Sequence, residues 1–236
     1  MWGMAKTFTG RMPRQAGVLR RAYRLMRAHF GHLHWWPGET GFEMCVGAIL
    51  TKNTSWSNVE RAIANLKAAG VMTPAKLLAL RESKLAVLLR PSGYFNVKAK
   101  RLRSFVQVLV GEYGGDLGRL FTGETSAVRE RLLAIKGVGP ETADSMLLYA
   151  GGHHRFVIDA YTRRIFHRHG WSGAKAGYEE LQRLCESALD QKPRAERLDY
   201  WQDYHAQLVI VGKQFCRTRQ PRCEGCPLKP LLPRKS

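Results

Sequence analysis

Apolar residues recur with helical spacing along most of the chain. The clearest case is residues 96–113, where apolar side chains three or four positions apart share one helix face: Val97, Leu102, Phe105, Val106 and Leu109. This stretch ends at the Gly114-Gly115 pair, as helices commonly do. Thr73-Pro74 begins another helix, with Thr as the N-cap and Pro in the first turn. Similar patterns predict helices over 83–89, 127–135, 142–150, 160–169, 178–189 and 199–214.

Only residues 156–158 look strand-like, and three residues are too few to found a sheet. We therefore predict an all-α fold of two helical lobes with a DNA-binding and active-site groove between them. The expected organisation is a basic N-terminal tail over residues 1–19, a helical core over 20–215 and a cysteine-containing loop over 216–236.

Charge narrows the class of partner. The 236 residues include 38 Lys and Arg against 19 Asp and Glu, a formal net charge of +19. A domain this basic favours a polyanion, because Lys and Arg displace the counterions condensed on phosphates. An anionic lipid surface is the main alternative. No segment is apolar enough to span a bilayer and the N-terminus has no apolar signal region, so we expect a cytoplasmic, nucleoid-associated protein with no membrane partner.

The most informative segment is the hairpin over 133–147. In the run Gly137-Val138-Gly139, two glycines permit a sharp turn that a Cβ would block, and Pro140 then opens a helix. The N–H groups of the turn and of the helix start, which include those of Glu141 and Thr142, can hold a phosphate oxygen, and Lys136 adds positive charge. Such a turn grips the DNA backbone without reading bases. An ordinary link between two helices is the alternative reading.

Taken with the Val157-Ile158-Asp159 run that follows it, this hairpin resembles that of the helix-hairpin-helix (HhH-GPD) DNA glycosylases typified by endonuclease III. The resemblance implies that Asp159 is the catalytic carboxylate. Bifunctional members of the family carry a lysine nucleophile where this chain has Glu141, and a carboxylate cannot form a Schiff base. The resemblance thus implies a monofunctional glycosylase without AP lyase activity.

Three further segments extend the resemblance. Tyr94 falls where the family places a wedge that enters the duplex, and Asn53 falls where an amide side chain fills the gap left by a flipped base. A packed tyrosine and a helix-terminal asparagine are the plain alternatives. The run Trp35-Trp36-Pro37 and the later Trp56 are similar to the base pocket of the bacterial 3-methyladenine DNA glycosylase III branch. Tryptophan faces suit a cationic alkylated purine, although packing alone could also explain these residues.

These features predict hydrolysis of the N-glycosidic bond of a flipped, alkylated purine such as 3-methyladenine in double-stranded DNA. Asp159 would stabilise the oxocarbenium-like sugar and orient water, while also capping the helix that follows it. The enzyme is expected to act as a monomer. The alternatives are a glycosylase for uracil or mismatched thymine and an inactive DNA-binding homologue. Ala48 stands where adenine-mismatch enzymes carry a glutamate, which argues against that activity.

The C-terminal cysteines suggest a metal centre. Cys216, Cys223 and Cys226 match three ligands of the family's [4Fe–4S] loop, but Leu232 occupies the place of the fourth. Three readings stay open: a cluster with an incomplete cysteine set, a loop that has lost its cluster, and a zinc site that borrows His205 or another residue. None of them is needed for the glycosylase chemistry. Cys45 and Cys185 lie in apolar helical patterns and are expected in the core.

Overall fold

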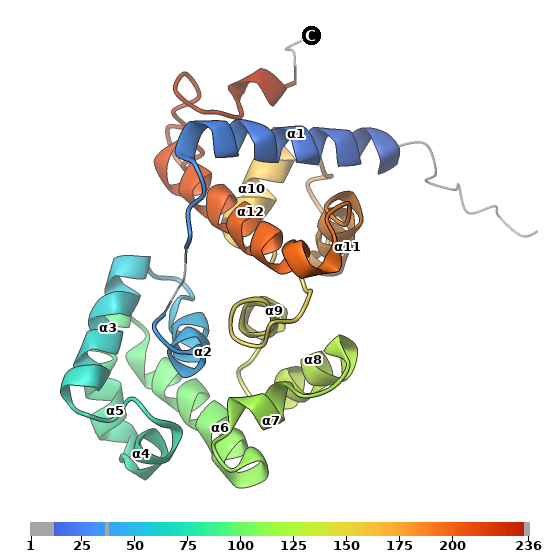
Figure 1. Ribbon diagram of the computed structural model, residues 1–236. Helices are drawn as coiled ribbons and strands as arrows, with labels where there is room; N and C mark the ends of the chain where they lie inside the picture. The colour runs from blue at the N-terminus through green and yellow to red at the C-terminus, as the bar shows by residue number, and fades with distance from the viewer. Residues whose placement is uncertain (1–11, 36–37, 234–236) are drawn as a thin grey trace, which may run out of the picture. The chain divides into compact units, whose positions relative to one another are not determined.

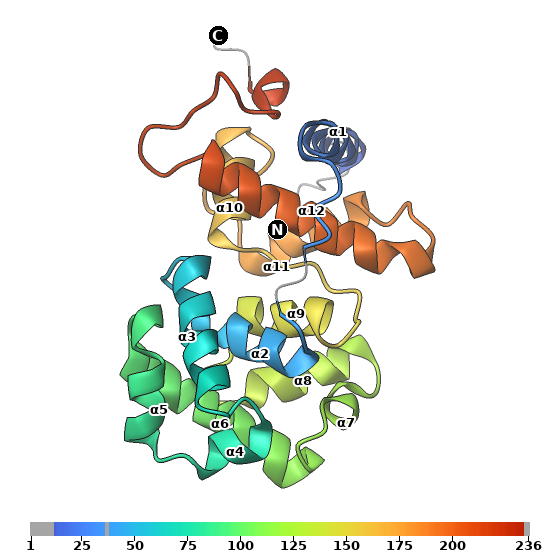
Figure 2. The ribbon, with the colours of Figure 1, turned by 60° about the vertical axis from the view of Figure 1, so that its left-hand side comes forward.

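A computed structural model describes residues 12–35 and 38–233, and within them it contains helices but no β-strand. The all-α prediction is therefore confirmed. The chain divides into two compact units. We call Trp36–Arg155 the central unit, and Met1–Trp35 together with Phe156–Ser236 the terminal unit. Figures 1 and 2 show the helices of each unit.

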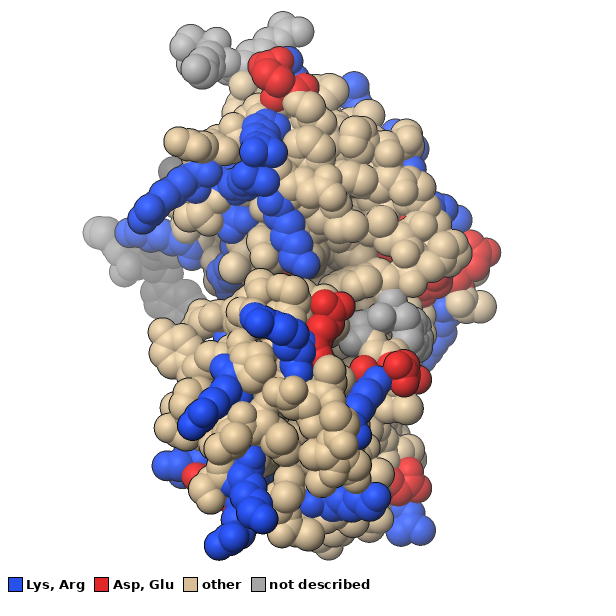
Figure 3. All heavy atoms as spheres, turned by 90° about the vertical axis from the view of Figure 1, so that its left-hand side faces the viewer, with Lys and Arg blue, Asp and Glu red and all other residues tan. Residues whose placement is uncertain are grey.

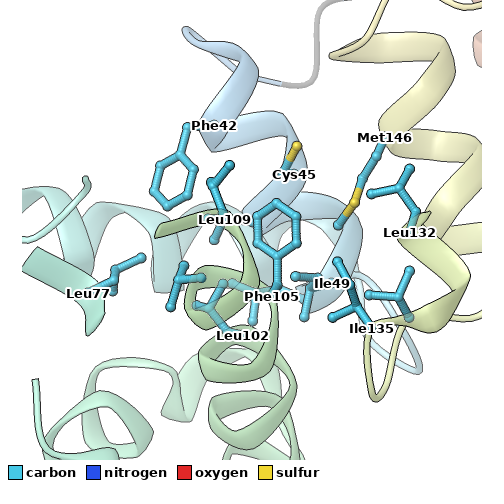
Figure 4. Close-up of a cluster of buried hydrophobic side chains, with 14 of the residues drawn as sticks. Phe42, Cys45, Ile49, Leu77, Leu102, Phe105, Leu109, Leu132, Ile135 and Met146 are labelled. Atoms are coloured by element: carbon cyan, nitrogen blue, oxygen red, sulfur yellow. The ribbon is translucent and has the colours of Figure 1, made fainter. Parts of the chain in front are cut away.

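The central unit is a bundle wrapped around one apolar core. Its elements are α2 (Gly41–Leu50), α3 (Trp56–Ala68), α4 (Pro74–Ala79), α5 (Glu82–Leu88), the 3-10 helix η1 (Arg90–Ser92), α6 (Phe95–Tyr113), α7 (Leu117–Phe121), α8 (Thr125–Ala134) and α9 (Pro140–Tyr149). Figure 4 shows how Phe105 of α6 and Ile49 of α2 lie among the core side chains, and both are almost fully buried. Burying these apolar faces supplies the main favourable contribution to the stability of the unit.

The terminal unit is built from two segments of the chain, one before and one after the central unit. It comprises α1 (Met12–Phe30), α10 (Ala160–Arg168), α11 (Tyr178–Ala188), α12 (Arg194–Gln214) and the 3-10 helix η2 (Lys229–Leu231). Helix α12 packs against α10 and α1, and α1 also packs against α11. The buried Tyr204 of α12 donates from its hydroxyl to the Leu19 carbonyl of α1, 2.9 Å away. The predicted basic tail over 1–19 was therefore too long, because α1 is already helical from residue 12.

Local sequence signals explain several helix ends. Thr73 accepts a hydrogen bond from the backbone of Lys76 and Pro74 follows it, as predicted. Helix α6 ends at Gly114 in the left-handed conformation. Residues 156–158 are neither helical nor part of a strand, and they are buried. Within the described residues, no helix combines the length and apolarity that crossing a membrane would require.

Candidate active site and DNA contacts

Asp159 lies at the start of α10, where it is the N-cap. Its Oδ1 accepts a hydrogen bond from the Thr162 N–H at 2.7 Å, and its side chain is only 13 % exposed. Its Oδ2 lies 3.7 Å from Nε2 of His205, which α12 contributes. Burial by itself raises the pKa of the Asp159 carboxyl, but His205 and the Thr162 N–H more than offset this, so that the pKa lies below its ordinary value. A buried carboxylate that stays ionised can stabilise a developing positive charge.

An aromatic ring lies beside this pair. The Trp35 and His205 rings have centroids 6.3 Å apart and planes tilted by 33°. Trp35 follows α1 in a non-helical segment. Trp36 and Pro37, the other predicted pocket residues of this run, lie outside the described residues.

Asp203 fixes the segment that carries Trp35. Its carboxylate is 0 % exposed, accepts a hydrogen bond from the Tyr23 hydroxyl at 2.7 Å and another from the Leu33 N–H at 2.9 Å, and lies 3.6 Å from Arg27. His32 reaches Asp199, also on α12, at 3.0 Å. These contacts tie residues 32 and 33 to α12, the helix that also positions His205, and so limit the freedom of Trp35.

The predicted hairpin is formed by α8, a tight turn and α9. Gly137 has φ +93°, and a Cβ there would lie 2.4 Å from Cγ of Arg101, so this position requires glycine. Gly139 has φ −101° and open space around its missing Cβ, so neither the backbone conformation nor packing demands glycine there. The prediction that both glycines are needed to make the turn is therefore wrong for Gly139. The open space at Gly139 leaves room for an atom of another molecule to come close to the backbone.

The residues of the turn differ in their exposure. Val138 is buried, whereas Lys136, Gly137 and Gly139 are exposed. Pro140 is in the first turn of α9, and no side chain caps that helix at Gly139. The N–H groups at the start of α9 therefore have no side-chain cap, which is a suitable arrangement for an anion. The Thr142 side chain is buried, so its hydroxyl is not exposed to an anion at the helix start.

A buried ion pair joins the two helices of the hairpin. Asp144 of α9 is fully buried, and its Oδ1 accepts from Nε of Arg129 on α8 at 2.7 Å. Its Oδ2 accepts from the same guanidinium at 3.3 Å, and Arg155 lies 3.8 Å from Oδ1. A two-pronged contact of this kind fixes the relative orientation of α8 and α9, and hence the geometry of the turn. The sequence reasoning did not identify this pair.

Glu141 has a partner that the sequence did not indicate. Its Oε2 lies 2.5 Å from Nζ of Lys52, which follows the end of α2. Both side chains are 30 % exposed. The carboxylate at this position therefore lies next to an amine contributed by another part of the central unit, in addition to any interaction with the α9 dipole.

Tyr94 has the exposure expected of a wedge. It precedes α6 in the left-handed conformation (φ 46°) with 69 % of its surface exposed, so it is not a packed tyrosine. The buried Lys98 supports this turn by donating from Nζ to the Ser92 carbonyl at 2.6 Å. Burial, together with the nearby charge of Arg101, lowers the pKa of Lys98 to about 8. A strained, exposed aromatic residue on a supported turn is suited to insertion into a base stack.

Asn53 lies in the link between α2 and α3, and Trp56 is the first residue of α3. Asn53 is exposed in the left-handed conformation (φ 53°), which asparagine tolerates better than most residues. Trp56 begins α3, is partly buried and packs against the core of the central unit; a Cβ added to Gly47 would lie 3.1 Å from its ring. Part of the Trp56 side chain thus has a packing role, and its place in a base pocket stays a prediction.

The three C-terminal cysteines line one cavity in the terminal unit. Cys216 is buried, Cys223 and Cys226 are half-buried, and the cavity of about 50 Å³ is also lined by Leu232 and His169. Burial raises the pKa of the Cys226 thiol, as do the neighbouring cysteines. Leu232 has no donor atom, so the residues present do not fit a [4Fe–4S] cluster with four cysteine ligands. His205 lies beside Asp159 and is therefore not available as the zinc ligand that we had considered. Cys45 and Cys185 are fully buried, as expected.

Among the described residues, the glycine turn at the start of α9, the exposed Tyr94 before α6 and the buried carboxylate at the start of α10 are the features expected of a helix-hairpin-helix DNA-binding protein. Residues 46–191 match the HhH-GPD superfamily of base excision DNA repair proteins. The chain belongs to this family and is a base excision DNA glycosylase. Figure 3 shows Lys and Arg side chains across the face drawn, in keeping with DNA as its substrate.

Known proteins agree with this assignment. A Methanocaldococcus jannaschii protein whose name describes it as a DNA repair glycosylase is 44 % identical over 213 residues, which are 90 % of this chain and 94 % of that protein. Endonuclease III of Thermotoga maritima is 27 % identical over 80 % of each chain. The crystal structure of Helicobacter pylori 3-methyladenine DNA glycosylase bound to 1,N6-ethenoadenine is 28 % identical, covers 85 % of this chain and 97 % of that one, and aligns with a TM-score of 0.72.

Proposed function

We propose that this glycosylase is monofunctional and hydrolyses the N-glycosidic bond of an alkylated purine, such as 3-methyladenine, after the damaged nucleotide has been flipped out of double-stranded DNA. The observation that carries the proposal is the buried, ionised Asp159, held by Thr162 and His205, with the Trp35 ring next to His205. The similarity to the Helicobacter pylori enzyme supports the choice of substrate class.

The chemistry follows from the charge that each group carries. Alkylation at a ring nitrogen gives the base a positive charge, which makes it a good leaving group and allows it to stack on the electron-rich face of Trp35. As the glycosidic bond breaks, positive charge passes to the sugar, and the carboxylate of Asp159 stabilises it and orients a water molecule. The water adds to the anomeric carbon and loses a proton, leaving an abasic site and the free base.

The central unit is assigned the DNA contacts. The N–H groups at the start of α9 and the Lys136 ammonium would bind a phosphate, Tyr94 would wedge into the duplex, and Asn53 would fill the gap left by the flipped nucleotide. Glu141 supplies a carboxylate rather than an amine, so no Schiff base forms at that position and the abasic strand stays intact. The enzyme would act as a monomer in the cytoplasm, associated with the nucleoid.

Base release from a panel of duplexes tests this proposal. The panel contains 3-methyladenine, 7-methylguanine, uracil and mismatched thymine or adenine, each assayed with and without alkali. We expect release of 3-methyladenine, with strand cleavage only after alkali. Faster release of uracil or thymine would overturn the substrate class, and strand cleavage without alkali would overturn the monofunctional assignment. Tight DNA binding without release of any base would favour an inactive binding protein.

A further inference from the structure

The cavity lined by the three C-terminal cysteines has a fourth wall residue with metal-binding chemistry. His169 directly follows α10 and is only 7 % exposed, and it lines this cavity together with Cys216, Cys223 and Cys226. Its Nε2 is buried and no hydrogen bond of normal geometry reaches it within the described residues, although the Leu228 backbone also interacts with the ring. A buried polar atom without a partner costs free energy unless something binds to it.

The other ring nitrogen of His169 favours the tautomer that a metal ligand needs. Nδ1 lies 2.9 Å from the Ile165 carbonyl, and a carbonyl can only accept, so Nδ1 carries the proton and donates it. The lone pair of the neutral ring is therefore on Nε2. Histidine ligands in metal sites generally donate their second N–H to a backbone carbonyl or a carboxylate in this way.

We propose that Cys216, Cys223, Cys226 and His169 form a mononuclear zinc site. Three thiolates and one imidazole are a typical donor set for structural Zn²⁺, which prefers four tetrahedral ligands. The site differs from a four-cysteine cluster, since Leu232 offers no fourth thiolate. Each thiol releases a proton on binding, and the resulting complex carries one net negative charge. Arg168, whose guanidinium donates to Cys216 Sγ at 3.4 Å, partly neutralises that charge.

Binding has to draw these side chains together. In the described part of the chain, no three His, Cys, Asp or Glu side chains already converge as a metal-binding group. Cys223 and Cys226 lie in a segment without helix between α12 and η2, so their side chains can move at small cost. Two contacts already hold the beginning of that segment near α10, because Arg168 donates to the carbonyls of Arg217 and Thr218. Zinc would close the rest of the loop around His169.

Metal analysis and cobalt substitution of the full chain test the site. Protein from zinc-supplemented medium should contain about one zinc per chain and neither iron nor acid-labile sulfide. After removal of the zinc, Co²⁺ should give the visible bands of tetrahedral cobalt and a thiolate charge-transfer band. The Tm of the zinc-free protein should be lower and should recover when Zn²⁺ is added. Iron with sulfide, or no measurable binding of Zn²⁺ and Co²⁺, would overturn the proposal.

Variants at His169 separate a ligand from a packing residue. H169A should lose the tetrahedral cobalt spectrum and bind Zn²⁺ at least ten-fold more weakly, as C226S should. H169C should regain tetrahedral binding, with a stronger charge-transfer band from its additional thiolate. The matched control is H167A, because His167 is an exposed histidine at the end of the same helix and should leave the spectrum unchanged. An unchanged cobalt spectrum in H169A and H169C would exclude His169 as a ligand.

Discussion

The Nζ atom of Lys52 lies 2.5 Å from Oε2 of Glu141, so the carboxylate at the start of α9 is paired with an amine that comes from the link after α2. Each side chain is 30 % exposed, and the pair contributes little to stability, about 0–1 kcal/mol. Its importance is chemical, because the family's bifunctional members use an amine at the position of Glu141.

The first prediction concerns this pair. Wild type and E141Q should both leave the abasic strand intact until alkali is added, because neither presents an amine at position 141. E141K should allow borohydride to trap a covalent complex with abasic DNA. K52M is the control. If wild type can be trapped and K52M cannot, Lys52 is itself a nucleophile and the monofunctional assignment is wrong.

The second prediction separates chemistry from binding. D159N should lower base release about 10²–10³-fold, because a neutral amide cannot stabilise the cationic sugar. Its affinity for DNA should change little. Its free energy of unfolding should lose only the stabilisation from the ionised carboxylate, since Asn is also a good N-cap. D159A adds loss of the cap, at about 1 kcal/mol. Single-turnover kinetics, DNA binding and urea unfolding give the three values. Full activity of D159N would exclude Asp159 as the catalytic carboxylate.

The third prediction concerns pH. The pKa of Asp159 is lowered in the folded protein, so the stabilisation from its ionised form is complete above the pKa of the unfolded chain and is lost as the pH falls through the lower folded value. Base release by wild type should therefore show no acid limb until the pH is below the ordinary Asp value of 3.8. In H205Q, the lowering effect of His205 would be lost while the raising effect of burial stayed, so the pKa of Asp159 should be higher than in wild type.

The pH–rate profile of H205Q tests this reasoning. Its acid limb should move to higher pH than that of wild type, and raising the pH should restore part of the activity. An H205Q profile that is lower at every pH but unchanged in shape would show that His205 acts on something other than the ionisation of Asp159.

The fourth prediction concerns Tyr94. Replacing it by Gly should leave the fold as stable or up to about 1 kcal/mol more stable, because Gly adopts the left-handed conformation without strain. Base release from a paired duplex should nevertheless fall, because the wedge is lost. The loss should be smaller for a lesion that is already unpaired. An equal loss on paired and unpaired substrates would contradict the wedge role.

The fifth prediction uses the two glycines of the hairpin as a matched pair. G137A should lower the free energy of unfolding by more than 1 kcal/mol, because the new Cβ would meet Arg101 at a positive φ. G139A should fold normally, since its φ of −101° and open surroundings accept alanine. If Gly139 admits a phosphate, G139A should bind both damaged and undamaged DNA more weakly. If G139A binds DNA with unchanged affinity, no DNA phosphate contacts the backbone at Gly139.

The sequence by itself determined the features that depend on neighbouring residues. The helical spacing of apolar positions predicted an all-α fold, and glycine, proline and the residues around them placed the hairpin. Asp159 was identified as an N-cap for the same reason, since the capped N–H belongs to Thr162, three residues later. Even so, the local pattern exaggerated the need for glycine at 139, because only the backbone angles show which glycine bears the positive φ.

Only the tertiary structure decided which distant side chains meet. His205 lies next to Asp159 because α12 packs against α10, and Lys52 reaches Glu141 because α2 packs against α9. Arg129 pairs with Asp144 through the packing of α8 on α9, and His169 joins the cysteines because the C-terminal loop returns to the end of α10. None of these partners has a local signal in the sequence. Ion pairs and ligand sets depend on distances of a few ångströms, which the packing of helices fixes and the spacing of residues along the chain does not.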